Sequence, residues 1–153
     1  MREGKHPVKI VVAFLLVAVF GCAKEYTGDP IVVRDAWIRE PPPRSPAAGY
    51  LVIENRGGEP VALIAVATEA AAQTEIHVME YKDDRMAMRR VEELQVPAGA
   101  EVALKPGGTH LMLMELRQPL RDGDEVELVL RFGDGTERRV QMPVEKKGLY
   151  ESD

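Results

Sequence analysis

The chain has 153 residues and a formal net charge of −5, with 25 acidic residues against 20 basic ones. This acidic balance argues against nucleic acid as a partner. The length fits one domain with a sizeable core, and the single cysteine excludes an internal disulfide.

The N-terminus predicts export with a lipid anchor. Three basic residues precede residues 10–21, which carry no charge. As a helix this run reaches about 18 Å, short of the ~30 Å hydrocarbon core, so residues 1–21 are predicted to be a signal peptide rather than a membrane span. Val19-Phe20-Gly21-Cys22 resembles the bacterial lipobox, which makes Cys22 the predicted lipidation site. Phe20 departs from the usual small or aliphatic residue, and a plain signal peptide is the alternative.

Cleavage before Cys22 would leave a chain with a net charge of −7, because three basic residues and one acidic residue are removed. We expect residues 22–30 to be a tether, residues 31–145 to form one domain, and residues 146–153 to be a flexible tail. The expected location is the periplasm or the extracytoplasmic face of a membrane. With Cys22 assigned to the lipid, no thiolate is left for a blue-copper electron-transfer site.

Short alternating segments separated by turn residues predict an all-β domain. The segments are 31–38, 48–55, 61–68, 75–81, 86–92, 100–104, 110–115, 125–132 and 136–144. Turn signals every 8 to 12 residues or so favour a sandwich or barrel. The three alanines within Glu69–Gln73 could make one helical turn. Pro41–Pro43 with Pro46 predict an exposed loop, because proline cannot donate to a strand ladder.

Histidine and methionine fall together in these predicted strands. Strand alternation puts His110, Met112 and Met114 on one face and two leucines on the other. His77 with Met79 repeats the pattern, as does Met86 with Met88, and the polar residues 82–85 between them suit a hairpin loop. Of the six methionines after residue 21, five lie between residues 79 and 114.

This donor set predicts monovalent copper. Thioether sulfur is soft and uncharged, so it binds Cu(I) well and competes poorly for zinc, calcium or magnesium, while imidazole adds a neutral nitrogen donor. The alternative is that the methionines pack in the core and the histidines are structural. The chain would then be a metal-free lipoprotein sandwich that binds a protein. Catalysis is not expected, because no nucleophile motif is present and both remaining histidines lie beside methionines.

The spacing of these residues resembles the PCu(A)C family of periplasmic copper chaperones. The family motif is His-x10-Met-x21-His-x-Met, and His77, Met88, His110 and Met112 match it without a gap. Further resemblance runs through Asp35–Arg39, Ala48–Tyr50, Val96–Gly99 and Leu104–Gly108, and covers residues 31–144 or so.

The resemblance implies a cupredoxin-like Greek-key β-sandwich that binds one Cu(I) through His77, Met88, His110 and Met112. It also implies delivery to the dinuclear copper site of cytochrome oxidase, or to another copper carrier, with copper storage or resistance as the alternative. Met79, Met86 and Met114 are candidate auxiliary ligands, for which ordinary packing is the alternative. Cu(II) binding through the histidines is a further candidate.

Overall fold

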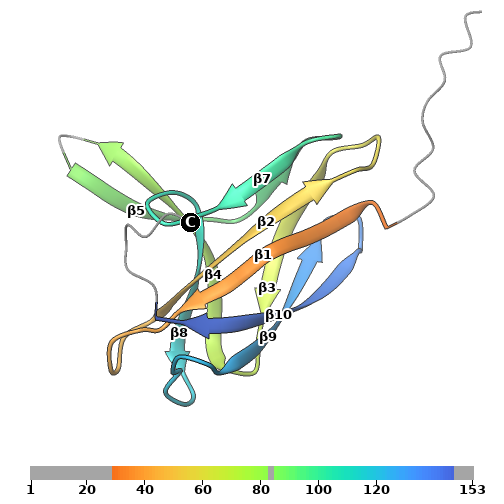
Figure 1. The fold of residues 1–153 in the computed structure, drawn as a ribbon. Coiled ribbons are helices and arrows are strands. Elements are labelled where there is room, and N and C mark those ends of the chain that lie inside the picture. Colours follow the sequence, from red (N-terminus) through yellow and green to blue (C-terminus); the bar gives the residue numbers. More distant parts are fainter. Residues whose placement is uncertain (1–28, 83–84, 147–153) are drawn as a thin grey trace, which may run out of the picture.

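The protein is built from β-strands throughout the residues that the computed structural model describes, 29–82 and 85–146 (Figure 1). The predicted signal peptide, Cys22 and residues 147–153 of the predicted tail lie outside these residues. In the described part of the chain, no helix is long and apolar enough to cross a membrane.

Ten strands form the domain. They are β1 (Ile31–Arg39), β2 (Ala47–Asn55), β3 (Val61–Ala67), β4 (Ala71–Lys82), β5 (Arg85–Val91), β6 (Leu94–Val96), β7 (Glu101–Leu104), β8 (His110–Leu116), β9 (Glu125–Phe132) and β10 (Glu137–Glu145). Every predicted strand is present, with ends that differ by at most four residues. The short strand β6 was not predicted. The exposed proline loop is confirmed between β1 and β2.

The predicted helical turn over Glu69–Gln73 is wrong. Its last three residues are the start of β4, and Ala71 pairs with Leu116 of β8. Only 4% of Ala71 is exposed, so it belongs to the core. Burial and cross-strand pairing here outweigh the helix propensity of an alanine run, which is worth a fraction of a kcal/mol per residue, roughly.

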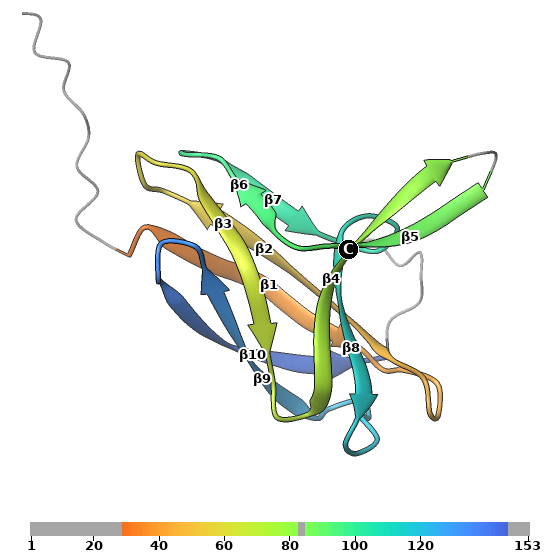
Figure 2. The same ribbon diagram turned by 180° about the vertical axis from the view of Figure 1, so that it is seen from behind.

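The strands make two layers that share one corner. One layer has the order β5-β4-β8-β2-β1, with β7 also paired to β2, and the other has the order β10-β9-β3-β6. A short parallel pairing of β1 with β10, at Ile38–Val144 and Arg39–Glu145, joins them. Figure 2 shows the two layers from behind. Hairpin pairs such as β4-β5 and β9-β10 alternate with pairings between strands distant in sequence, such as β4-β8 and β3-β9, as in a Greek key.

The core lies between the layers and follows from strand alternation. Leu111 and Leu113 of β8 are fully buried, as predicted, while Met112 between them faces the other way. Strand β9 alternates in the same manner, with Leu128, Leu130 and Phe132 inside. One face of each layer is therefore apolar, and the outer face is free to carry other chemistry.

Strands β4 and β5 form a hairpin that extends beyond the body of the sandwich (Figures 1 and 2). The pairing of β4 with β8 ends at His77 and His110, so residues 78–82 pair with β5 alone. Lys82 pairs with Arg85, which makes the connection shorter than the predicted four-residue loop. The outer half of the hairpin is thus two-stranded.

Candidate metal centre

The predicted ligands share one surface, the outer face of the layer that contains β5, β4 and β8. Residues directly opposite each other in an antiparallel ladder lie on the same face. His77 of β4 is opposite His110 of β8 on one side and Arg90 of β5 on the other. Because β4 lies between β5 and β8, the predicted ligands on these three strands come together on one surface.

The methionines occupy the ladder positions on either side of this histidine pair. Toward the hairpin, Met88 is opposite Met79 and Met86 is opposite Tyr81. In the other direction, Met112 is opposite Glu75. Successive positions on one face are about 6.6–6.8 Å apart along a strand, so Met88 and Met112 bracket the two imidazoles.

Met114 lies two same-face positions from the histidine pair, as Met86 does on the hairpin side. It is opposite Gln73 and four residues from His110, about 13 Å along the strand. The remaining methionine, Met142, is fully buried in the core. Met79, Met88 and Met112 are therefore next to the histidine pair, while the other three methionines lie away from it.

His77 is held so that one ring nitrogen is free to bind a metal. Its Nε2–H donates a hydrogen bond of 2.7 Å to the carboxylate of Glu75. A carboxylate only accepts, so the proton is on Nε2 and the neutral ring carries its lone pair on Nδ1. That nitrogen lies 2.9 Å from the sulfur of Met88. Both atoms are electron-pair donors, and a soft cation is a species that both can bind.

His110 is oriented in the opposite sense. Its Nδ1–H donates to the carbonyl oxygen of Gly108 at 3.0 Å, which leaves the lone pair on Nε2. A tight turn presents that carbonyl: Lys105 and Thr109 close it at 2.8 Å, and Gly107 adopts a φ of 76°, which glycine tolerates without strain. The two imidazole rings meet edge to face with their centroids 5.9 Å apart.

Exposure changes steadily across the site. His110 is 5% exposed, His77 and Met112 are partly buried, and Met88 is 49% exposed. One end of the donor set is therefore fixed in the protein while the other is open to solvent. Such an arrangement allows a partner to reach the ion without unfolding the site.

Glu75 is the residue that sequence reasoning missed. Its carboxylate accepts hydrogen bonds from His77, from Gln73 at 2.6 Å and from Arg90 at 3.2 Å. The hydrogen bond from His77, with smaller help from Arg90, holds the pKa of Glu75 below its usual value, although partial desolvation opposes this. The carboxylate is thus a charged partner that fixes the His77 ring.

Alternation alone could have found Glu75, because it lies two residues before His77 on the same face. Glu80 and Glu115, which follow the His-Met pairs, take no part in this contact: Glu80 pairs with Arg89 at 2.6 Å, and Glu115 is exposed.

An aromatic wall closes the site beside His110. The ring of Tyr50 is 6.5 Å from that of His110, and Trp37 lies 4.6 Å from Tyr50. Arg39 stacks over both aromatic rings, with its guanidinium carbon 5.3 Å from the Tyr50 centroid and 5.7 Å from that of Trp37. Burial raises the pKa of Tyr50 while Arg39 opposes the rise, so the phenol is a neutral neighbour.

A β-bulge in β1 places this wall. Arg34 is opposite Val52 and Trp37 is opposite Tyr50, so one extra residue lies between them. Asp35 in the bulge has a φ of 53°. The insertion exchanges the two faces of the strand, which puts Trp37 on the outer face and Ile38 in the core.

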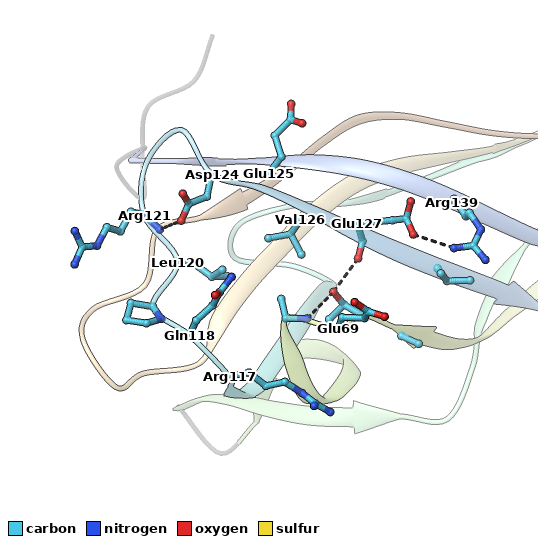
Figure 3. Close-up of a pocket in the computed structure, with 15 residues that line it drawn as sticks. Glu69, Arg117, Gln118, Leu120, Arg121, Asp124, Glu125, Val126, Glu127 and Arg139 are labelled. Carbon is cyan, nitrogen blue, oxygen red and sulfur yellow. Dashed lines mark hydrogen bonds and ion pairs between the residues drawn. The ribbon is translucent and has the colours of Figure 1, made fainter.

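A cavity of about 880 Å³ lies elsewhere. It is formed by the β3–β4 turn, the β8–β9 connection and the start of β9, at the end of the sandwich away from the hairpin (Figure 3). Charges of both signs line it, including an ion pair of 2.9 Å between Glu127 and Arg139. No predicted ligand is among its lining residues. Within the described residues, no three His, Cys, Asp or Glu side chains are grouped to hold a metal.

Comparison with known proteins gives matches along the whole domain. A family profile described as "Putative lipoprotein LpqE-like" matches residues 31–144. The chain is 29% identical to "Putative lipoprotein Lxx21020" of Leifsonia xyli subsp. xyli, across 87% of this chain and 86% of the relative.

Solved structures share the fold. The solution structure of CuI-DR1885 from Deinococcus radiodurans is 30% identical, with a TM-score of 0.60 over 73% of this chain and 76% of that one. The copper-bound PCuAC domain from PmoF2 has a TM-score of 0.67 at 23% identity, over 80% and 97% of the two chains. These matches confirm the predicted cupredoxin-like sandwich and the resemblance to PCu(A)C domains.

Proposed function

Because the chain belongs to the LpqE-like family and has the fold of PCuAC domains, we propose that it is an extracytoplasmic Cu(I) chaperone. The proposed ligands are Nδ1 of His77, the sulfur of Met88, Nε2 of His110 and the sulfur of Met112. The observation that carries the proposal is the pairing of free ring nitrogens with thioethers on one outer face. The relative CuI-DR1885, at 30% identity, supports the choice of metal.

Two neutral imidazoles and two neutral thioethers leave the bound ion with its charge of +1. Glu75 supplies a nearby negative charge and fixes the orientation of the His77 ring. Release needs no change of oxidation state, because ligands can be exchanged one at a time with those of a recipient. Met88, the most exposed of the four, is the ligand that a recipient would displace first.

The resemblance supports delivery to the dinuclear copper site of cytochrome oxidase as the proposed role. A lipid on Cys22 would tether the domain to the membrane that holds such an oxidase, and the lipoprotein description of the family and of the Leifsonia relative supports this anchor. Storage would use the same ligands, and it differs from delivery in that copper would stay bound when a recipient domain is added.

The test is an anaerobic titration of the full chain with Cu(I) against a chromophoric chelator. Cys22→Ser is included throughout, because a free thiolate would itself bind Cu(I). We expect one tight equivalent that is weakened by Met88→Ala and by His110→Ala. Met114→Leu is the matched control on the same face and should leave the affinity unchanged. Failure of the chain to compete with the chelator would overturn the proposal and leave a metal-free interaction module.

A further inference from the structure

Two methionines on the projecting hairpin are not explained by packing. Exposed large apolar side chains in the described structure include Met86 at 56%, Met88 at 49% and Tyr81 at 70%. All three lie on one face of the hairpin, the same face as His77. A methionine that serves the core is buried like Met142, so the position of Met86 and Met88 needs another reason.

The ladder register brings three thioethers within reach of one another. Met79 is directly opposite Met88, a pair whose Cβ atoms lie about 4.5–5.5 Å apart in such ladders. Met86 is diagonal to Met79, at about 7–8 Å, a span that long side chains close. Methionine has three rotatable side-chain bonds and can turn its sulfur toward a common point.

We propose that Met79, Met86 and Met88 form a second Cu(I) position on the hairpin, made of thioethers alone, through which copper enters and leaves the histidine site. This inference rests on the proposed function and extends it. Three neutral sulfur donors favour Cu(I) over harder ions. The position is outside the body of the sandwich, where the two-stranded part of the hairpin is open to a partner (Figure 1).

Met88 belongs to both positions, which gives the ion a route between them. Its sulfur already lies 2.9 Å from Nδ1 of His77. Copper can therefore stay bound to Met88 while Met79 and Met86 are exchanged for the two imidazoles and Met112. The step transfers no electron and no proton, because His77 presents an unprotonated Nδ1 while its Nε2–H continues to donate a hydrogen bond to Glu75. The thioether position should bind more weakly, since it lacks imidazole.

The test uses the full Cys22→Ser chain with methionine methyl groups labelled with ¹³C. In a His77→Gln/His110→Gln variant, anaerobic Cu(I) should shift the methyl resonances of Met79, Met86 and Met88 together. The methyl resonance of Met142, which is buried in the core, reports whether the variant is folded. Adding Met79→Leu and Met86→Leu should weaken the remaining binding by about tenfold or more. Met114→Leu, the matched control, should not.

A second measurement needs no histidine substitution, so it tests the proposal even if the His77→Gln/His110→Gln variant does not fold. In the chain with both histidines, Met79→Leu/Met86→Leu should leave the equilibrium affinity for Cu(I) unchanged and slow transfer to a chelator by about tenfold. Unshifted Met79 and Met86 methyl groups in a folded double-histidine variant would overturn the second position, as would an unchanged transfer rate. Neither result touches the proposed function, which fails only if the chain with both histidines binds no Cu(I).

Discussion

Glu75→Gln tests whether Glu75 orients the ring of His77 for metal binding. The carboxylate of Glu75 holds the Nε2–H of His77 at 2.7 Å, and both side chains are largely shielded, at 12% and 13% exposed. Removing such a partner behind a metal-binding histidine weakens metal affinity by about 10- to 100-fold. The amide that replaces the carboxylate keeps the shape and can still accept a hydrogen bond. We therefore expect a loss of Cu(I) affinity near the lower figure, about tenfold.

Glu80→Gln is the matched control. It lies on the same strand but on the other face, and its ion pair is with Arg89. Competition against a chromophoric Cu(I) chelator, in the Cys22→Ser full chain without oxygen, should give the native affinity for this variant. Equal affinities for the two variants, or tighter binding by Glu75→Gln, would refute the claim that Glu75 orients His77.

The same residue makes a prediction about acid. Since the pKa of Glu75 is lowered in the folded chain, its contribution to stability is present above the ordinary carboxyl pKa. That contribution is lost as the pH falls through the lowered value. Without copper, Glu75→Gln should show a smaller decrease in the free energy of unfolding than the native chain over this acidic range. A parallel decrease in the two chains would contradict the assignment.

Two further outcomes are expected. Cu(I) affinity should decrease between about pH 7 and about pH 5, because an imidazole must be unprotonated to bind the ion whereas a thioether does not titrate. A constant affinity in chelator competition would contradict ligation by His77 and His110. Leu111→Ala should cost about 2–5 kcal/mol in urea unfolding, because Leu111 is fully buried between two predicted ligands. Ile64→Ala, at a position 47% exposed, should cost far less, and similar losses in the two variants would show that Leu111 is not a core residue.

Strand alternation accounts for the part of the site that sequence could predict. In His110–Met114 the period of two fixes which side chains share a face. The structure has both leucines on the core face of the layer, and the histidine and the two methionines on its outer face. This division of side chains between two faces follows from strand geometry alone and needs no tertiary information. The convergence of β4, β5 and β8 on one surface depends on topology, which local pattern does not contain. The clustering of histidine and methionine allows this convergence, and the resemblance to a known family implies it.

Features that depend on long-range register escaped prediction. The extra residue in β1 is visible only once β1 is paired with β2, and it decides that Trp37 faces His110 rather than the core. The helical turn expected at Ala71 failed for the same reason, since pairing with Leu116 decides its conformation. Strand β6 has three residues and pairs only through contacts with β3, so its own sequence carries little signal.

The account's central claim is that two imidazoles and two thioethers bind one Cu(I) on the outer face. X-ray absorption spectroscopy of the Cys22→Ser full chain loaded with one equivalent of Cu(I) tests it most directly. The account predicts two nitrogen and two sulfur scatterers, with one sulfur lost in Met88→Leu and no sulfur lost in Met114→Leu. A spectrum without sulfur scatterers, or one that Met88→Leu leaves unchanged, would contradict it.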